Sequence, residues 1–171
     1  MNFQPPISYT RLKEFGHIKE DCQNYWNDVT WLELTTAEEF IEATSDELPR
    51  CHEAPGSIIV FACDAGGYPL CWDTRRVQDG EYEVCQIFQY LDTPLAPTFP
   101  WFLLREFVLM LEDHLGDGEK YEEKILEHLS ILESIVTPDQ FKIAKEALGG
   151  SRNSQQVSDF LRMHFPVRYH W

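Results

Sequence analysis

Acidic side chains are the most frequent chemistry-bearing residues in this chain of 171 residues. Paired carboxylates can transfer protons or hold a magnesium ion. Asp-Gly turns, however, commonly carry solvated acids, and Gly80 is flanked by two of them. Metal binding or hydrolysis therefore remains the least favoured interpretation of these residues. Five acidic residues lie on or beside three predicted strands: Asp64, Asp73, Asp79, Glu81 and Glu83.

The cysteine and histidine residues give little evidence of a catalytic or metal-binding site. Cys51 and His52 are adjacent but lie in a proline-rich segment without ligand-spaced companions, as in an ordinary loop. The five cysteines are odd in number and form no C-x-x-C pair, which disfavours a disulfide framework or structural zinc. The sequence also lacks a phosphate-binding glycine loop and a G-x-S-x-G elbow. We therefore expect no catalytic residue, no cofactor and no metal.

The net charge narrows the classes of partner. Twenty-nine acidic and 14 basic residues give a formal charge of −15. Nucleic acids and anionic lipids are bound through Lys and Arg, so neither is an expected partner. Such a charge favours a basic protein partner, although solubility alone would also explain it.

The apolar residues are sufficient for a folded core, at 43% of the chain. The N-terminus lacks the basic start and apolar run of a secretory signal. The most apolar stretch, 99–111, is interrupted by Arg105 and Glu106 and is too short to span a bilayer. We expect a soluble, cytoplasmic protein whose thiols are free.

Strand-forming segments alternate with turn signals over residues 29–90. Residues 29–34 favour a strand, and a Thr36–Glu39 capping box then predicts a short helix. Residues 58–63 form an unbroken apolar run, typical of a strand buried on both faces. Together with strands at 68–74 and 82–90, this run predicts an antiparallel meander.

The remaining sequence predicts helices. Pro94 and Pro97 should end the sheet. Apolar residues then recur at helical spacing from Trp101 to Leu115, and a second capping box begins at Thr137. We divide the chain into an α+β domain at 1–117 and a helical extension at 118–171 that packs on it.

One run of motifs resembles a known family. It comprises the strand IIVFACDAGGYPLCWDT, the turn QDGEYEV and the helix FPWFLLREFVLML. In this order the motifs, within residues 29–115, are similar to the SUKH superfamily, which joins a fungal cell-wall-synthesis regulator to many bacterial immunity proteins. The element Cys71-Trp72-Asp73-Thr74 matches the family's Cys-hydrophobic-Asp-Thr-like strand, and Asp79-Gly80-Glu81 matches its turn.

The resemblance implies an α+β fold with a curved antiparallel sheet flanked by helices. It also implies a non-catalytic protein that neutralises a polymorphic toxin domain. Separately, we expect the chain to be a monomer or a homodimer. A scaffold or regulatory module without a toxin partner is the main alternative, and a small carboxylate-based hydrolase is the lesser one. We expect the acidic residues around the meander to bind a basic protein partner, together with an aromatic anchor residue if one is exposed. These predicted partner-binding residues are Asp64, Asp73, Asp79, Glu81, Glu83, Trp72 and Tyr82.

Overall fold

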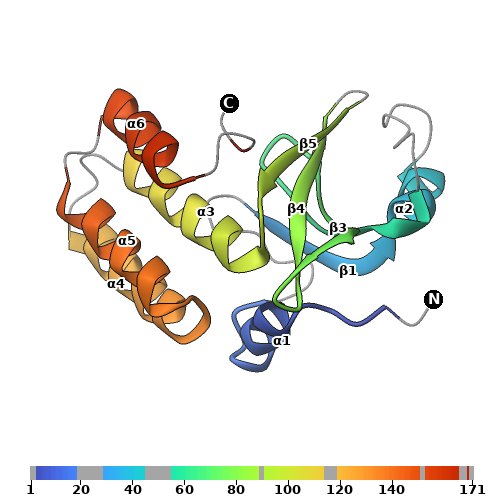
Figure 1. The fold of residues 1–171 in the computed structure, drawn as a ribbon, viewed down its shortest axis with the longest axis horizontal. Helices are drawn as coiled ribbons and strands as arrows, with labels where there is room; N and C mark the ends of the chain where they lie inside the picture. Colours follow the sequence, from blue (N-terminus) through green and yellow to red (C-terminus); the bar gives the residue numbers. More distant parts are fainter. Residues whose placement is uncertain are drawn as a thin grey trace.

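The sheet forms the centre of the fold (Figure 1). The computed structural model describes residues 3–18, 29–44, 55–88, 91–113, 119–150, 153–165 and 169. Five antiparallel strands lie in the order of the sequence, so each neighbouring pair is joined without a crossover. The predicted α+β class with an antiparallel sheet and C-terminal helices is confirmed. The strands are β1 (Thr30–Thr36), β2 (Ile58–Cys63), β3 (Pro69–Gln78), β4 (Glu81–Phe88) and β5 (Leu91–Ala96).

The central strand β2 has the burial that its apolar run predicts. Residues 58–62 are all buried, because both faces of this strand are covered. Strand β3 extends four residues beyond the predicted end at Thr74. The turn to β4 contains only Asp79 and Gly80, with φ values of 54° and 77°. Positive φ at both positions is typical of a two-residue hairpin turn that matches the strand twist.

Strand β5 corrects the prediction that Pro94 ends the sheet. Pro94 lies within β5 and pairs with Cys85, next to an irregularity in the register between Val84 and Cys85. A proline donates no ladder hydrogen bond, so a central strand would exclude it. β5 is the last strand in the sheet order, and an edge position tolerates the missing donor.

Two helices begin at the capping boxes read from the sequence. The Thr36 hydroxyl accepts from the Glu39 backbone N–H at 3.1 Å, and the Glu39 carboxylate accepts from the Thr36 N–H at 3.0 Å. Thr137 and Gln140 make the same reciprocal bonds. The helices are α1 (Ile7–Glu14), α2 (Ala37–Thr44), α3 (Phe99–Asp113), α4 (Glu119–Ile135), α5 (Pro138–Gly149) and α6 (Ser154–His164), and a 3-10 turn, η1, spans Pro55–Ser57.

An aromatic cluster joins α3 to the sheet. The rings of Phe61 and Trp72, on neighbouring strands, are stacked with their centroids 4.4 Å apart. Phe99, at the start of α3, meets both rings edge-on at 5.5 and 5.7 Å. Tyr9 of α1 meets Trp72 edge-on at 4.9 Å. These contacts make one core of α1, the sheet and α3, with ring geometries that favour aromatic pairs.

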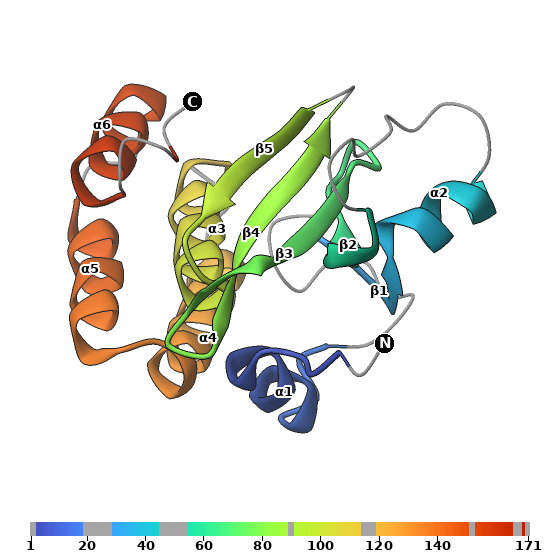
Figure 2. The same cartoon turned by 45° about the vertical axis from the view of Figure 1, so that its right-hand side comes forward.

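The C-terminal helices extend this core on the other side of α3. Figures 1 and 2 both show α3 between the sheet and the group formed by α4, α5 and α6. Leu132, Ala144 and Val157, one from each of these helices, belong to the same buried cluster as Phe102 of α3. Burial of these side chains holds the helical extension against α3.

We expect Phe61→Ala to lower the free energy of unfolding by about 3–5 kcal/mol, because it leaves a cavity among Trp72 and Phe99. Urea denaturation followed by fluorescence measures this change. Val77→Ala is the matched control, since Val77 lies on β3 with 59% of its surface exposed. A control effect within about 0.5 kcal/mol is expected. A similar loss in both variants would contradict the aromatic core.

Candidate functional site

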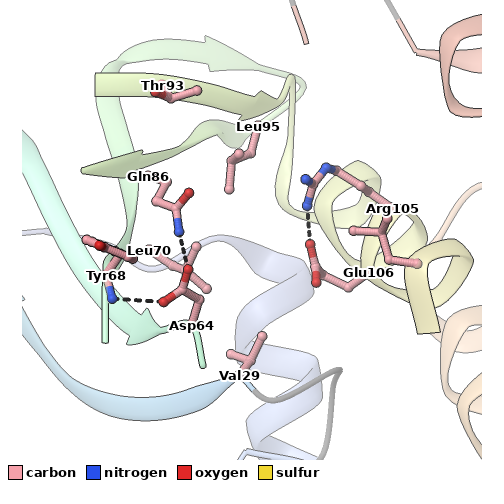
Figure 3. A pocket seen from close by; sticks show the side chains of 10 residues that line it. Val29, Asp64, Tyr68, Leu70, Gln86, Thr93, Leu95, Arg105 and Glu106 are labelled. Atoms are coloured by element: carbon pink, nitrogen blue, oxygen red, sulfur yellow. Dashed lines mark hydrogen bonds and ion pairs between the residues drawn. The ribbon is translucent and has the colours of Figure 1, made fainter. Parts of the chain in front are cut away.

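A pocket of about 480 Å³ lies between one end of the sheet and α3 (Figure 3). Its volume falls within the range of ligand-binding pockets, about 300–1,000 Å³. Its lining comes from the β2–β3 turn, from the four elements β3, β4, β5 and α3, and from the residue before β1. The lining residues are Val29, Asp64, Tyr68, Leu70, Gln86, Thr93, Leu95, Arg105, Glu106 and Leu109.

Asp64 forms a rigid polar wall of the pocket. Its Oδ1 atom accepts hydrogen bonds from the backbone N–H groups of Gly66 at 2.9 Å and Tyr68 at 2.8 Å. Its Oδ2 atom accepts a hydrogen bond from the Gln86 side-chain amide. Side chains of this type stabilise tight turns by accepting from backbone groups two residues further on. The β2–β3 turn and β4 therefore fix the position of the Asp64 carboxylate.

Arg105 and Glu106 form the opposite wall, on α3. Only 3% and 7% of their surfaces are exposed, and the two side chains form an ion pair. Adjacent positions on a helix do not normally face each other, so both side chains bend together beside the pocket. Burial lowers the pKa of Arg105, and the Glu106 charge opposes this effect. A charged pair this deeply buried is costly unless it is well compensated.

The pocket is suited to recognition of a polar group on an apolar stem. Two carboxylates and one guanidinium leave its charged lining with a formal charge of −1. Val29, Leu70 and Leu95 supply apolar walls.

Burial raises the pKa of the nearby Cys63 thiol to about 11, with a further contribution from Asp64. Cys63 is therefore protonated at neutral pH and is a poor nucleophile.

Most of the predicted partner-binding residues lie on β3, on β4 or in the turn between these strands. Asp73 is 4% exposed and accepts from Arg75 Nε at 2.8 Å and from the Arg75 backbone N–H at 3.0 Å. Arg76 Nε lies 3.3 Å from carboxylate oxygens of both Asp73 and Glu83. Tyr169 donates a hydrogen bond to Glu83 at 2.9 Å. These carboxylates thus belong to an internal ion-pair cluster.

The pKa of Asp73 reflects two opposing effects. Burial alone would raise it, because a carboxylate loses solvation in the protein interior. Hydrogen bonds from the Arg75 side chain and backbone, together with the charges of Arg75 and Arg76, outweigh burial and hold the pKa below its ordinary value. The ionised carboxylate therefore stabilises the fold.

Glu81 caps helix α1 from across the molecule. Its carboxylate accepts from the Ser8 backbone N–H at 3.0 Å and from the Ser8 hydroxyl at 2.6 Å. Pro6, the N-cap residue, supplies no side-chain cap, so Glu81 provides the anionic group that favours a helix N-terminus. Burial raises the pKa of Glu81, and the bonds from Ser8 and the charge of Arg11 partly offset the increase.

The predicted partner-binding residues do not form one free acidic rim. Trp72 is fully buried, so it does not meet the condition of exposure under which it was expected to serve as an aromatic anchor. Its side chain points into the core because Val84 and Ile59 neighbour it on the flanking strands. Tyr82 is half-buried, and its hydroxyl donates to the Gln4 carbonyl oxygen at 3.3 Å.

The acidic residues are also divided between the two ends of β3. Asp64 lies at the β2–β3 turn, whereas Asp79 lies at the β3–β4 turn. Asp79 is exposed, and the other four carboxylates are bonded within the fold. Cys51 and His52 lie outside the described residues.

Sequence reasoning did not identify the α3 wall of the pocket as a site. Arg105 and Glu106 appeared only as charges that interrupt an apolar stretch. Two adjacent charges inside a deeply buried helix are the signal that could have found them, because buried charges require partners. Gln86, an amide within an apolar strand, gives a similar but weaker signal.

Comparisons with known proteins add no relative. No protein-family model, curated protein or solved structure matches this chain. Within the described ranges, no three His, Cys, Asp or Glu side chains are grouped to hold a metal ion. The helices in those ranges are also too short or too polar to cross a membrane.

We expect Asp73→Asn to destabilise the fold by about 1–2 kcal/mol at pH 7, a modest value because Arg75 and Arg76 are 38% and 48% exposed. The folded pKa of Asp73 is lowered, so its contribution is complete above the ordinary pKa of 3.8 and is lost as pH falls below it. The difference between variant and parent should therefore shrink at acid pH. Urea denaturation at pH 7 and pH 3 measures it, with Asp79→Asn as the exposed control. A difference that grows in acid would contradict the ion-pair cluster.

Glu106→Gln is expected to cost about 3–5 kcal/mol, because it leaves the buried Arg105 charge without its partner. The double variant Arg105→Met/Glu106→Leu removes both charges and should be less destabilised than the single variant. Thermal and urea denaturation of the three proteins test this order. A double variant at least as unstable as Glu106→Gln would show that the pair contributes net stability.

Proposed function

We propose that this chain is a non-catalytic, cytoplasmic immunity protein that binds and neutralises a basic toxin domain. The distribution of charge carries the proposal. Residues 1–117 contain 21 acidic and seven basic residues, a net charge of −14, whereas residues 118–171 contribute only −1. The charge is thus concentrated in the sheet-bearing part, whose motifs resemble the SUKH superfamily.

Residues 1–117 carry exposed acidic side chains besides the carboxylates that pair with arginines within the fold. Glu33 on β1, Glu38 on α2 and Asp79 at the β3–β4 turn are exposed. The exposed Arg75 and Arg76 are partly neutralised by Asp73 and Glu83. An acidic surface of this kind accelerates encounter with a basic partner and disfavours acidic ones. Toxin domains that cleave nucleic acids have such basic surfaces.

The two alternatives make different demands on the surface. A scaffold or regulatory module would use the same acidic surface for several weak partners, whereas an immunity protein binds one toxin tightly. A carboxylate hydrolase would use Asp73 and Glu83, but Arg75, Arg76 and Tyr169 engage these groups. This engagement favours a structural role for them.

A direct experiment takes the product of the gene that adjoins this one as the candidate toxin domain. We expect co-expression of the full chain to restore growth of cells that produce this domain. Calorimetry with an inactivated toxin domain should give a 1:1 complex. Binding of several unrelated proteins with similar weak affinity would favour the scaffold, and lack of binding to the neighbouring toxin would contradict the proposal.

We expect the triple variant Glu33→Gln/Glu38→Gln/Asp79→Asn to associate with the toxin domain about 3–10-fold more slowly at low salt, because it removes steering charges. Stopped-flow fluorescence over a range of salt concentrations measures the rate. The matched control is Glu122→Gln/Glu133→Gln/Glu146→Gln, which removes three exposed charges from the helical extension. Equal slowing of both variants, or of neither, would contradict docking on the sheet-bearing part.

A further inference from the structure

The pocket between the β2–β3 turn and α3 has features of a site for one extended, charged side chain. It brings Asp64 and the Arg105–Glu106 pair to opposite walls, with leucine side chains between them (Figure 3). We propose that this pocket binds a lysine or arginine side chain of the protein partner. The inference rests on the proposed function for the source of that side chain and adds the site that receives it.

The charges of the lining favour a cation over an anion. Glu106 already compensates the Arg105 guanidinium, so Arg105 has little excess attraction for an anion. The Asp64 carboxylate then leaves one net negative charge, which repels anions and attracts ammonium or guanidinium groups. The net charge of −15 acts in the same direction at longer range.

The apolar walls suit the stem of a basic side chain. Leu70, Leu95 and Leu109 line the pocket together with Val29. Lysine and arginine bury their methylene groups on apolar surface while the charged end reaches a polar group. A cavity of about 480 Å³ accommodates this stem together with the charged group.

The polar groups are held in place before any ligand arrives. Two backbone N–H groups and the Gln86 amide fix the Asp64 carboxylate, and Arg105 holds Glu106. Binding therefore requires little ordering of these side chains, and the entropy cost of association is reduced. Charge-assisted hydrogen bonds to a fixed carboxylate are stronger than those between neutral groups.

The free protein and small probes test the site without any toxin. The probe is Nα-acetyl-lysine methylamide, and Nα-acetyl-norleucine methylamide is its uncharged counterpart with the same stem. Resonances of the Gln86 side-chain amide and the Gly66 and Tyr68 backbone amides report on the pocket. We expect the lysine derivative to shift these resonances to saturation and the norleucine derivative to bind at least about tenfold more weakly.

Two variants act on different walls. Asp64→Asn removes the charge but keeps an oxygen that accepts from Gly66 and Tyr68, and Thr93→Phe on the exposed edge strand narrows the pocket. Each is expected to weaken binding of the lysine derivative at least about tenfold. Glu133→Gln is the matched control, since Glu133 is exposed on α4 and does not line the pocket.

Loss of affinity in either variant beside an unchanged control supports the site. Three results would overturn it: equal binding of the lysine and norleucine derivatives, saturation by Nα-acetyl-glutamate methylamide instead, or unchanged lysine binding in both variants. Because the probes require no partner, their failure is distinct from failure of the toxin to bind. A toxin complex that is unaffected by Asp64→Asn would place its interface elsewhere.

Discussion

The packing of Phe99 against the stacked Phe61 and Trp72 rings is the contact on which the other features depend. It fixes the start of α3 on one face of the sheet. Because a helix is rigid, this contact also fixes where Arg105 and Glu106 lie across the pocket from the β2–β3 turn. The same helix presents its other side to α4, α5 and α6. Loss of this contact would therefore disturb the pocket and the helical extension together.

The elements most accurately predicted from sequence are those whose signals are local. The apolar run 58–63, the Asp79-Gly80 turn and the Thr36 and Thr137 capping boxes each depend on a few neighbouring residues. β5 was missed because the edge position that makes Pro94 acceptable is a property of the whole sheet. Local propensity contains no information about that position.

The candidate site was less predictable for the same reason. Asp64 was singled out from sequence, but its partner Gln86 lies 22 residues away and is brought near by the pairing of three strands. The pairing of Asp73 with Arg75 and Arg76 is local, yet its burial depends on the strands on either side. The sequence therefore gives the net charge, but it does not show which carboxylates are solvated and which are buried.

The bond between Ser8 and Glu81 has a consequence for synthesis of the chain. It joins residues 73 positions apart, whereas the strands of the meander pair with their immediate neighbours. On a ribosome, α1 emerges long before the carboxylate that caps it. An isolated helix of eight residues has little stability in water. Helix α1 is therefore stably formed and packed on the sheet only after β4 is present. Helix α1 is thus translated before the sheet but reaches its final place only after β4 has formed, and its apolar residues Tyr9 and Leu12 are exposed during that interval.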